Sequence, residues 1–267
     1  MQKEITFVQG DIQDQAVLTR AARGCDVVFH QAAVVSVTKT IEDPVTSTRI
    51  NDLGTLQVLE AARQNKVRRV VLANSSAVYG DDPQLPKTES MPPKPLSPYA
   101  VQKLTNEYYA RLYYRLYGME TVCLRYFNVF GPRQDPSSPY SGVISIFMTR
   151  AAGAQRPVIY GDGNQTRDFV YLQDVVQANL FAAQHEAAAG QVFNVGTNRA
   201  IQINALWEMV GKLAQCQPTP KYVDPCAGDL AHSLSSIRKA NERMGFTPSV
   251  AFEDGLRRTF IWYGQGD

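Results

Sequence analysis

The chain has few cysteines and histidines, which limits both disulfide bonds and metal sites. Four cysteines and three histidines are scattered through 267 residues. They show neither the spacing of zinc ligands nor that of a disulfide framework. We therefore expect no metal site, and the unpaired cysteines favour a reducing, cytoplasmic location.

The sequence also lacks a strong charge bias and a long apolar run. Its 27 basic and 25 acidic residues give a formal net charge of +2 and are spread along the chain. Nothing therefore indicates a surface for nucleic acid. We find no segment of membrane-spanning length, no signal peptide and no internal repeat. With 44% hydrophobic residues, the chain is instead typical of a globular protein with one large or two modest domains.

Short apolar runs alternate with helical patterns along most of the chain. We expect strands at residues 5–8, 25–30, 67–73, 120–126 and 192–196, and helices at 15–23, about 44–63, 99–117 and 172–185. This alternation predicts an α/β fold with a doubly wound parallel sheet and right-handed crossovers. The pattern changes after Pro132, where residues 135–168 and 201–267 predict a smaller mixed α/β lobe. The sheet domain would then contain residues 1–134 and 169–200.

A tyrosine and a lysine stand four residues apart at the start of a predicted helix. Pro98 suits the first turn, and Gly118 is a typical stop after residues 99–117. Residues at i and i+4 share a helix face, so we expect Lys103 beside Tyr99. A nearby positive charge favours the phenolate. We therefore predict a lowered pKa for Tyr99, which makes it a candidate base.

Taken alone, this spacing also fits two ordinary surface residues, and a second feature favours a functional role. The segment Ser75-Ser76-Ala77-Val78-Tyr79-Gly80 follows the strand predicted at 67–73. Ligands of parallel sheets bind at the carboxyl ends of the strands. We therefore expect Ser75 to share a substrate hydroxyl with Tyr99.

Further segments occur in a recognisable order along the chain. They are Gly10-Asp11-Ile12, His30-Gln31-Ala32-Ala33, Asn51, Leu124-Arg125-Tyr126-Phe127-Asn128, Arg167-Asp168-Phe169-Val170-Tyr171 and Gly228-Asp229. Together with Ser75, Tyr99 and Lys103, they resemble the extended short-chain dehydrogenase/reductase family. The likeness covers almost the whole chain and is greatest to the nucleotide-sugar 4-epimerases that act on UDP-glucose and UDP-N-acetylglucosamine.

The resemblance implies a Rossmann-like dinucleotide-binding domain, a substrate-binding lobe and a mechanism. In these enzymes a hydride moves from C4 of the sugar to bound NAD and then returns to the other face of the keto-sugar. Tyr99 would be the base that takes the proton of the C4 hydroxyl. Lys103 would lower the pKa of Tyr99 and hold the cofactor ribose. Ser75 would bridge the substrate oxygen and the phenol, with Ser76 assisting.

The resemblance also implies the residues that contact each ligand. For NAD these are Asp11 and Ile12 at the adenine, Ala32 and Ala33 along the cofactor, and Tyr126 on the nicotinamide side. For the substrate they are Ser36 near the sugar, Asn128 and Arg167 on the diphosphate, Asp229 on the ribose, and Val143 and Tyr160 near the uracil. Some of these have an ordinary structural alternative. Val143 and Tyr160 fit simple packing equally well, and Asn51 could only tie a helix to a strand.

Two features of the resembling family are missing. Its members begin with a strand and a Gly-x-x-Gly-x-x-Gly turn that holds the dinucleotide pyrophosphate, and a second strand supplies an acid for the adenosine ribose. Because residues 5–8 resemble the third strand of the family, the sheet would be N-terminally truncated and NAD binding weak or lost. Either residues 5–8 pack against the 25–30 strand, or a second copy covers the gap, or the natural protein is longer. In addition, Cys226 stands where the family usually has an arginine for the substrate phosphates.

Two functions therefore stay open. The first is NAD-dependent C4 epimerisation of a nucleotide sugar, impaired in this chain. The second is a non-catalytic or fragment protein that binds a nucleotide sugar or a protein partner. A dehydratase is disfavoured because Ser76 and Ala77 stand where those enzymes carry an acidic pair, while a simple reductase stays open. A small residue, Ser233, falls where glucose-restricted epimerases carry a bulky aromatic one, which would leave room for an N-acetyl group.

Two predicted helices have more apolar surface than one buried face requires. They cover residues 50–63 and 99–117, and the second is rich in tyrosine and leucine. The resembling family pairs these two helices with their copies in a four-helix contact. We therefore expect a homodimer.

Overall fold

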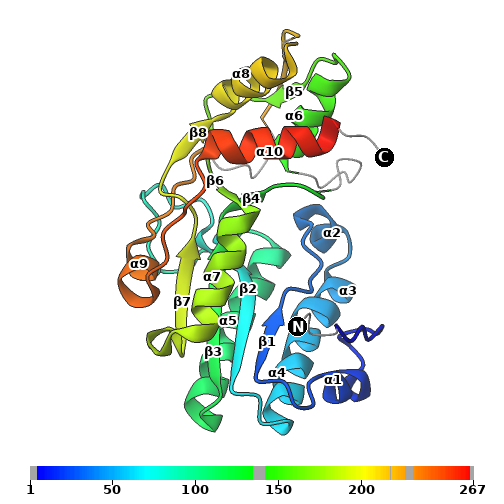
Figure 1. The fold of residues 1–267 in the computed structure, drawn as a ribbon, viewed down its shortest axis with the longest axis vertical. Helices are drawn as coiled ribbons and strands as arrows, with labels where there is room; N and C mark the ends of the chain where they lie inside the picture. The colour runs from blue at the N-terminus through cyan, green and yellow to red at the C-terminus, as the bar shows by residue number, and fades with distance from the viewer. Residues whose placement is uncertain (1–4, 135–141, 217, 226–230, 265–267) are drawn as a thin grey trace.

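The computed structural model describes residues 5–134, 142–216, 218–225 and 231–264. Figure 1 shows an elongated molecule with a parallel sheet in one part and a smaller part, which carries α8 and α10, at the other end. No helix of the described segments combines the length and apolarity needed to cross a membrane.

The larger part is built on a four-stranded parallel sheet. Its strands are β1 (Val27–His30), β2 (Arg69–Ser75), β3 (Glu120–Tyr126) and β7 (Gln191–Val195), in the order β1-β2-β3-β7. The register places Ser75 opposite Tyr126, and Tyr126 opposite Val195. The carboxyl ends of these strands therefore meet at one edge of the sheet, as ligand binding in such folds requires. The predicted α/β fold with a parallel sheet is confirmed.

Helices cover both faces of this sheet because successive strand residues point to opposite sides. Val70 and Leu72 pack under α4 (Thr55–Gln64) and α5 (Pro98–Tyr117). Val71 packs on the other face, where α7 (Leu172–Gln184) and α9 (Arg238–Met244) lie. The remaining helical elements of this part are α1 (Gln15–Ala21), α2 (Val37–Glu42), α3 (Pro44–Thr48), η1 (Arg49–Gly54), η2 (Ser76–Tyr79) and η3 (Glu186–Ala188).

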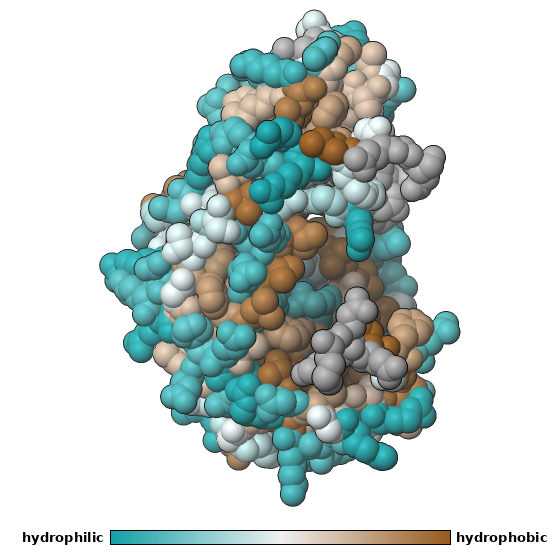
Figure 2. All heavy atoms as spheres, viewed as in Figure 1, coloured by the Kyte–Doolittle hydropathy of each residue, from teal (hydrophilic) through white to brown (hydrophobic). Residues whose placement is uncertain are grey.

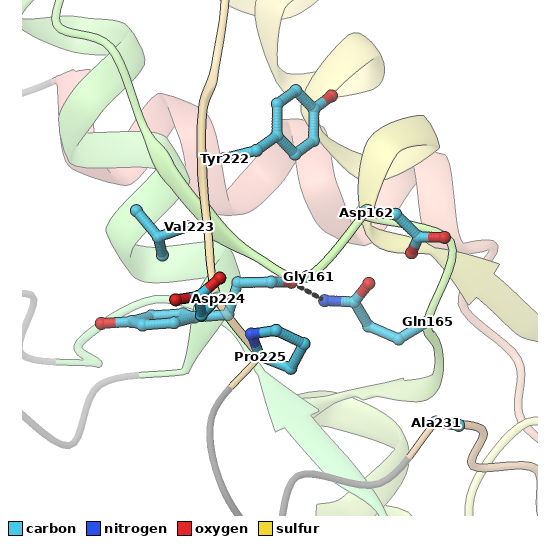
Figure 3. A pocket seen from close by; sticks show the side chains of 9 residues that line it. Gly161, Asp162, Gln165, Tyr222, Val223, Asp224, Pro225 and Ala231 are labelled. Atoms are coloured by element: carbon cyan, nitrogen blue, oxygen red, sulfur yellow. Dashed lines mark hydrogen bonds between the residues drawn. The ribbon is translucent and has the colours of Figure 1, made fainter.

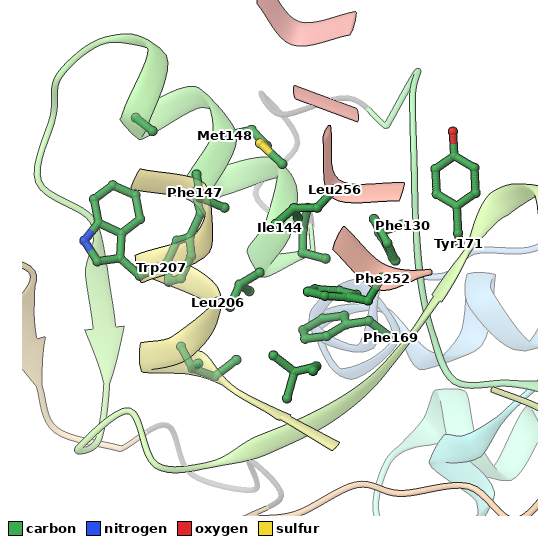
Figure 4. Close-up of a cluster of buried hydrophobic side chains, with 14 of the residues drawn as sticks. Phe130, Ile144, Phe147, Met148, Phe169, Tyr171, Leu206, Trp207, Phe252 and Leu256 are labelled. Carbon is green, nitrogen blue, oxygen red and sulfur yellow. The ribbon is translucent and has the colours of Figure 1, made fainter. Parts of the chain in front are cut away.

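The smaller part has two short sheets and an aromatic core. One sheet contains β4 (Asn128–Phe130), β6 (Thr166–Tyr171) and β8 (Ala200–Gln202), and the other pairs β5 (Val158–Tyr160) with β9 (Lys221–Val223). Its helices are α6 (Val143–Ala152), α8 (Ile203–Ala214) and α10 (Phe252–Gly264). Figure 4 shows the core between them, where Phe169 stacks on Phe252 at 5.7 Å between ring centres.

The N-terminal segment does not form the strand expected at residues 5–8. These residues have no regular structure, and the side chains of Ile5 and Phe7 are 95% and 85% exposed. A strand is stabilised by its ladder of hydrogen bonds, and within the described residues β1 pairs only with β2. Both the strand prediction and the alternative that this segment pairs with the 25–30 strand are therefore wrong.

The helix predicted from about residue 44 is interrupted. Regular α-helix covers α3 and α4, while η1 between them is π-helical. A π-helical turn is rare and is often found at functional sites. It carries Asn51, which is buried beside the loop that follows β1.

Candidate active site

Three of the predicted residues meet where β2 ends against α5. Ser75 is the last residue of β2, and α5 packs on both β2 and β3. The helix begins where the sequence indicates, because the Ser97 hydroxyl caps the amide of Ala100 and Pro98 occupies the first turn. The Lys103 ammonium donates to the Ala73 carbonyl at 2.9 Å and lies 5.8 Å from the centre of the Tyr99 ring.

The expected effect of Lys103 on Tyr99 is not found. Burial raises the pKa of the Tyr99 phenol, and a side-chain hydrogen bond with Ser75 opposes this only in part. Burial also lowers the pKa of Lys103 to about 8. The prediction of a lowered pKa for Tyr99 is therefore wrong, because the ammonium is held on a backbone carbonyl and desolvation of the phenol dominates.

Asn51 joins the loop after β1 to α5. Its Oδ1 accepts from the Val34 amide at 2.8 Å, while Nδ2 donates to the Val34 carbonyl at 3.0 Å and to Gln102 Oε1 at 2.7 Å. Gln102 in turn donates to Ser47 and Thr48. Gln102 lies between Tyr99 and Lys103 in the sequence, and only its position next to them could have singled it out.

A second buried contact, between His30 and Thr55, lies at the start of the same loop. His30 ends β1, and its Nε2 lies 2.9 Å from the Thr55 hydroxyl. That hydroxyl donates to the Asn51 carbonyl at 2.6 Å, so the imidazole is the donor in its contact with Thr55. Burial, with a smaller effect of Lys103, lowers the pKa of His30 to about 4. The imidazole is therefore neutral at pH 7.

The residues expected at the adenine end of NAD and along the cofactor are exposed or half-buried. Asp11 Oδ1 accepts from the Gln13 amide at 2.8 Å within its own turn, and Ala32 is exposed while Ala33 is half-buried. Ile12 lies against Gly54, where an added Cβ would come within 2.8 Å of Ile12 Cδ1. Another expected cofactor residue, Tyr126, instead stands opposite Ser75 in the sheet.

Tyr126 is fixed by two neighbouring amides. Its hydroxyl lies 2.8 Å from Asn179 Nδ2, which donates to it, and 3.3 Å from Gln31 Oε1. Because Tyr126 stands opposite Ser75 in the register of β2 and β3, the ring is part of the edge where the strands end. The structure thus brings this residue together with Ser75, whereas Asp11 is exposed and Ile12 is half-buried against Gly54.

Four of the expected substrate residues line one cavity of the smaller part. Asn128, Val143, Tyr160 and Arg167 come from β4, α6, β5 and β6, and they surround about 240 Å³ together with Gln165. Arg167 Nη1 donates to the Thr166 carbonyl at 2.9 Å. The cavity therefore combines a guanidinium, amides and apolar walls, which suits a ligand with both a charged group and a planar ring.

A wider cavity of about 730 Å³ adjoins this one through Tyr160 and Gln165. Figure 3 shows its lining, where Gln165 comes from the turn before β6 and Tyr222, Asp224 and Pro225 come from β9 and the segment after it. The Gln165 side chain donates to the Tyr160 carbonyl at 2.7 Å. The sequence did not single out Tyr222 or Gln165, because neither belongs to a recognisable motif.

The remaining predicted residues have other positions. The Ser36 hydroxyl caps α2 by accepting from the Lys39 amide, and its residue is 6% exposed. Ser76 opens η2 directly after Ser75. Asp229 and Cys226 lie outside the described residues.

Figure 2 shows the face of the molecule hollowed between its two parts, with hydrophobic side chains gathered there. The described residues contain no cluster of three or more potential metal ligands.

Comparison with known proteins identifies the family. The model of the NAD dependent epimerase/dehydratase family matches residues 1–196. The chain belongs to this family. It is 37% identical over 259 residues to the UDP-glucose 4-epimerase of Mycolicibacterium smegmatis, which covers 96% of this chain and 82% of that relative.

Solved structures agree with this family. The UDP-glucose 4-epimerase of Thermotoga maritima with UDP-glucose superposes with a TM-score of 0.93 at 33% identity, over 97% of this chain and 84% of that one. The UDP-N-acetylglucosamine 4-epimerase of Methanobrevibacter ruminantium, in complex with UDP-N-acetylmuramic acid, gives 0.92 at 38% identity, over 96% and 82%. The resemblance to nucleotide-sugar 4-epimerases and the Rossmann-type fold are thereby confirmed.

Proposed function

We propose that this chain catalyses NAD-dependent epimerisation at C4 of a nucleotide-diphosphate sugar of the UDP-glucose or UDP-N-acetylglucosamine type. The observation that carries the proposal is the meeting of Ser75, Tyr99 and Lys103 at the end of β2. The relatives named above are 4-epimerases for these two sugars, which supports the choice of substrate class.

The chemistry of the chain's own residues follows from their positions. Bound NAD would supply a hydride acceptor and donor. The Tyr99 phenolate takes the proton of the C4 hydroxyl and later returns it to the oxygen of the keto-sugar. Ser75 bridges that oxygen and the phenol. Lys103, whose ammonium donates to the Ala73 carbonyl and lies 5.8 Å from the centre of the Tyr99 ring, would hold the cofactor ribose.

The substrate would lie between the two parts of the molecule. Arg167 and Asn128 suit the diphosphate, because guanidinium and amide donors match its oxygens. Val143 and Tyr160 offer apolar and aromatic surface to the base in the same cavity. In this arrangement the sugar extends toward Ser36, Ser75 and Ser76. Ser233 is buried in the smaller part, where its amide donates to the Thr166 carbonyl at 3.1 Å.

The described residues fit one end of NAD better than the other. Tyr99 and Lys103 lie together, and Tyr126 stands opposite Ser75 in the register of β2 and β3, which suits the ribose and nicotinamide end. The pyrophosphate has no glycine-rich turn, because no Gly-x-x-Gly occurs in the sequence up to Gly131. Asp11 and Ala32 are exposed. We infer that this chain binds NAD weakly and that its turnover is impaired.

The exposed cofactor end also favours a second function. A chain that has kept the cavity around Arg167 but not a pyrophosphate site would bind a nucleotide sugar, or a protein partner, without catalysis. The hydrogen bond between Ser75 and Tyr99 favours the epimerase function. The exposure of Asp11 favours the binding function without catalysis.

Titration calorimetry with NAD and, separately, with UDP-N-acetylglucosamine distinguishes these functions, followed by an assay for the 4-epimer. Binding of both ligands with turnover supports the epimerase. Binding of the sugar nucleotide alone supports the binding protein. Binding of neither ligand contradicts both functions, and tight stoichiometric binding of NAD contradicts the inferred weakness of the pyrophosphate site.

We also propose a homodimer through the helices that contain residues 50–63 and 99–117. Apolar side chains on these helices are exposed, with Leu53 at 48%, Val101 at 49%, Tyr108 at 52% and Leu112 at 46%. Burying them against a second copy would be favourable. Light scattering at micromolar concentration should give twice the chain mass, and Leu112→Asp should shift it toward one chain. A single-chain mass for the unmodified protein would contradict the dimer.

A further inference from the structure

A third cavity, of about 310 Å³, shares no lining residue with the two cavities described above. It lies between α5, β3 and the loop of residues 89–93. Its lining consists of Glu89, Ser90, Met91, Pro92, Pro93, Leu104, Glu107, Tyr108, Arg111 and Arg125. Four of these ten residues carry a charge, so the cavity has an electrostatic character of its own.

The wall of this cavity contains a buried ion pair with one unused donor. Arg125 Nε and Nη2 donate to the two oxygens of Glu107, both at 2.7 Å. The Tyr79 ring lies 4.7 Å from the guanidinium, and its hydroxyl donates to Asn194. Arg125 is 2% exposed, and its Nη1 has no hydrogen-bond partner within the described residues. Buried donors are almost always paired, so an acceptor is missing at this wall.

The two carboxylates of the cavity, Glu89 and Glu107, already have positively charged or hydrogen-bonding partners. Both oxygens of Glu107 accept from Arg125. Glu89 Oε1 accepts from the Asn194 amide at 2.8 Å, and the positive charge of Lys239 is close enough to interact with it. Arg111 is exposed on α5 and makes no ion pair with a carboxylate of the described residues. The donors left over are therefore the Arg111 guanidinium and Arg125 Nη1.

We propose that this cavity binds a small organic anion, either a carboxylate or a phosphate ester. Arg111 and Arg125 would receive the oxyanion, because planar guanidinium groups match its oxygens. Met91, Pro92 and Leu104 offer apolar surface to the carbon skeleton. The volume of about 310 Å³ has room for a ring or short chain beside the charged group. Tyr108 forms one wall and also belongs to the face proposed for the second copy.

The position of this site on α5 links it to the catalytic centre. Tyr99, Lys103, Glu107 and Arg111 follow one another at intervals of four residues, so they lie along one side of the same helix. Arg125 precedes Tyr126 on β3. A ligand at Arg111 and Arg125 would therefore contact the helix and the strand that position the catalytic residues.

Calorimetric titration of the full chain, in its solution oligomeric state, with phenyl phosphate and with benzoate tests this site. We expect saturable binding of at least one probe with one site per chain, and the preferred probe distinguishes phosphate from carboxylate. Arg111→Glu should weaken binding roughly tenfold or more, and Arg111→Gln by less, since a charge-assisted hydrogen bond is lost.

Two matched variants serve as controls. Arg115→Glu changes the same charge one turn further along the exposed side of α5, and Arg167→Ala removes the guanidinium of the substrate cavity. Neither should change the affinity of the probe. The proposal is overturned if no probe binds saturably, or if binding survives Arg111→Glu but is lost in Arg167→Ala. All of these positions except Arg167 are exposed, and circular dichroism checks that each variant is folded.

Discussion

The catalytic end of the proposed site and its adenine end are built in different ways. Around Lys103, the side chains of His30, Asn51 and Gln102 are buried and bonded to each other's elements. Among the described residues, the Asp11 side chain is hydrogen-bonded only to Gln13 in the same turn. The first region is held by the whole sheet domain, whereas the second depends on its local turn. The proposed catalytic centre is therefore held by buried contacts that the Asp11 turn does not have.

This difference follows from what each region packs against. The proposed catalytic residues stand on β2 and α5, which are central to the sheet and to its helical layer. Among the described residues β1 is an edge strand, residues 5–8 do not pair with it, and Phe7 is 85% exposed. Side chains next to a central strand gain neighbours on both sides, while those beyond an edge gain few.

The largest expected effect is a loss of turnover without a change in the fold. Tyr99→Phe removes the phenol that takes the proton of the C4 hydroxyl, so 4-epimer formation should fall about a thousandfold. The ring remains, and the free energy of unfolding should change little. Turnover is measured with UDP-N-acetylglucosamine and added NAD. Tyr114→Phe is the matched control, since Tyr114 lies on the same helix, is partly exposed and is not among the residues proposed to contact a ligand. Equal losses in both variants would argue against Tyr99 as the base.

The next effect compares the stability of the two regions directly. Asn51→Ala should lower the free energy of unfolding by about 3 kcal/mol, because it leaves the Val34 amide, the Val34 carbonyl and Gln102 Oε1 without partners in a buried place. Asp11→Ala, in the exposed turn, should be nearly neutral. Urea unfolding measures both. If the Asp11 variant lost as much stability as the Asn51 variant, the contrast between the two regions would not hold.

Much of the fold could be predicted because hydrophobic periodicity and end signals are local. The helix from Pro98 to Tyr117 begins with a serine cap and ends at Gly118 with φ of +67°, and both residues are visible in the sequence. The prediction of a strand at residues 5–8 was wrong because strand formation is not local. The apolar pattern of these residues is clear, but a strand needs a partner, and pairing is a property of the assembled sheet.

The site could be predicted only where a residue belongs to a motif. Ser75, Tyr99 and Lys103 were found from their spacing and resemblance, and the structure brings them together. The network of Asn51 with Gln102 depends on where α5 crosses η1, which no local pattern gives. The pKa of Tyr99 was misjudged because burial, which is set by the surrounding fold, outweighs a charge that the sequence places nearby.

The smallest of these effects uses pH to sharpen the same comparison. The pKa of His30 is about 4 in the folded chain, because of burial and then Lys103, while an unfolded histidine titrates near 6.5. As the pH falls between these values, the unfolded chain binds a proton that the folded chain does not, so stability decreases. Between pH 7 and pH 5 the loss from this residue should be about 2 kcal/mol. Urea unfolding of the unmodified chain and of His30→Gln at both pH values isolates it. If both proteins lost the same stability, the imidazole would be accessible to protons, and the catalytic end of the site would be less enclosed than its hydrogen bonds indicate.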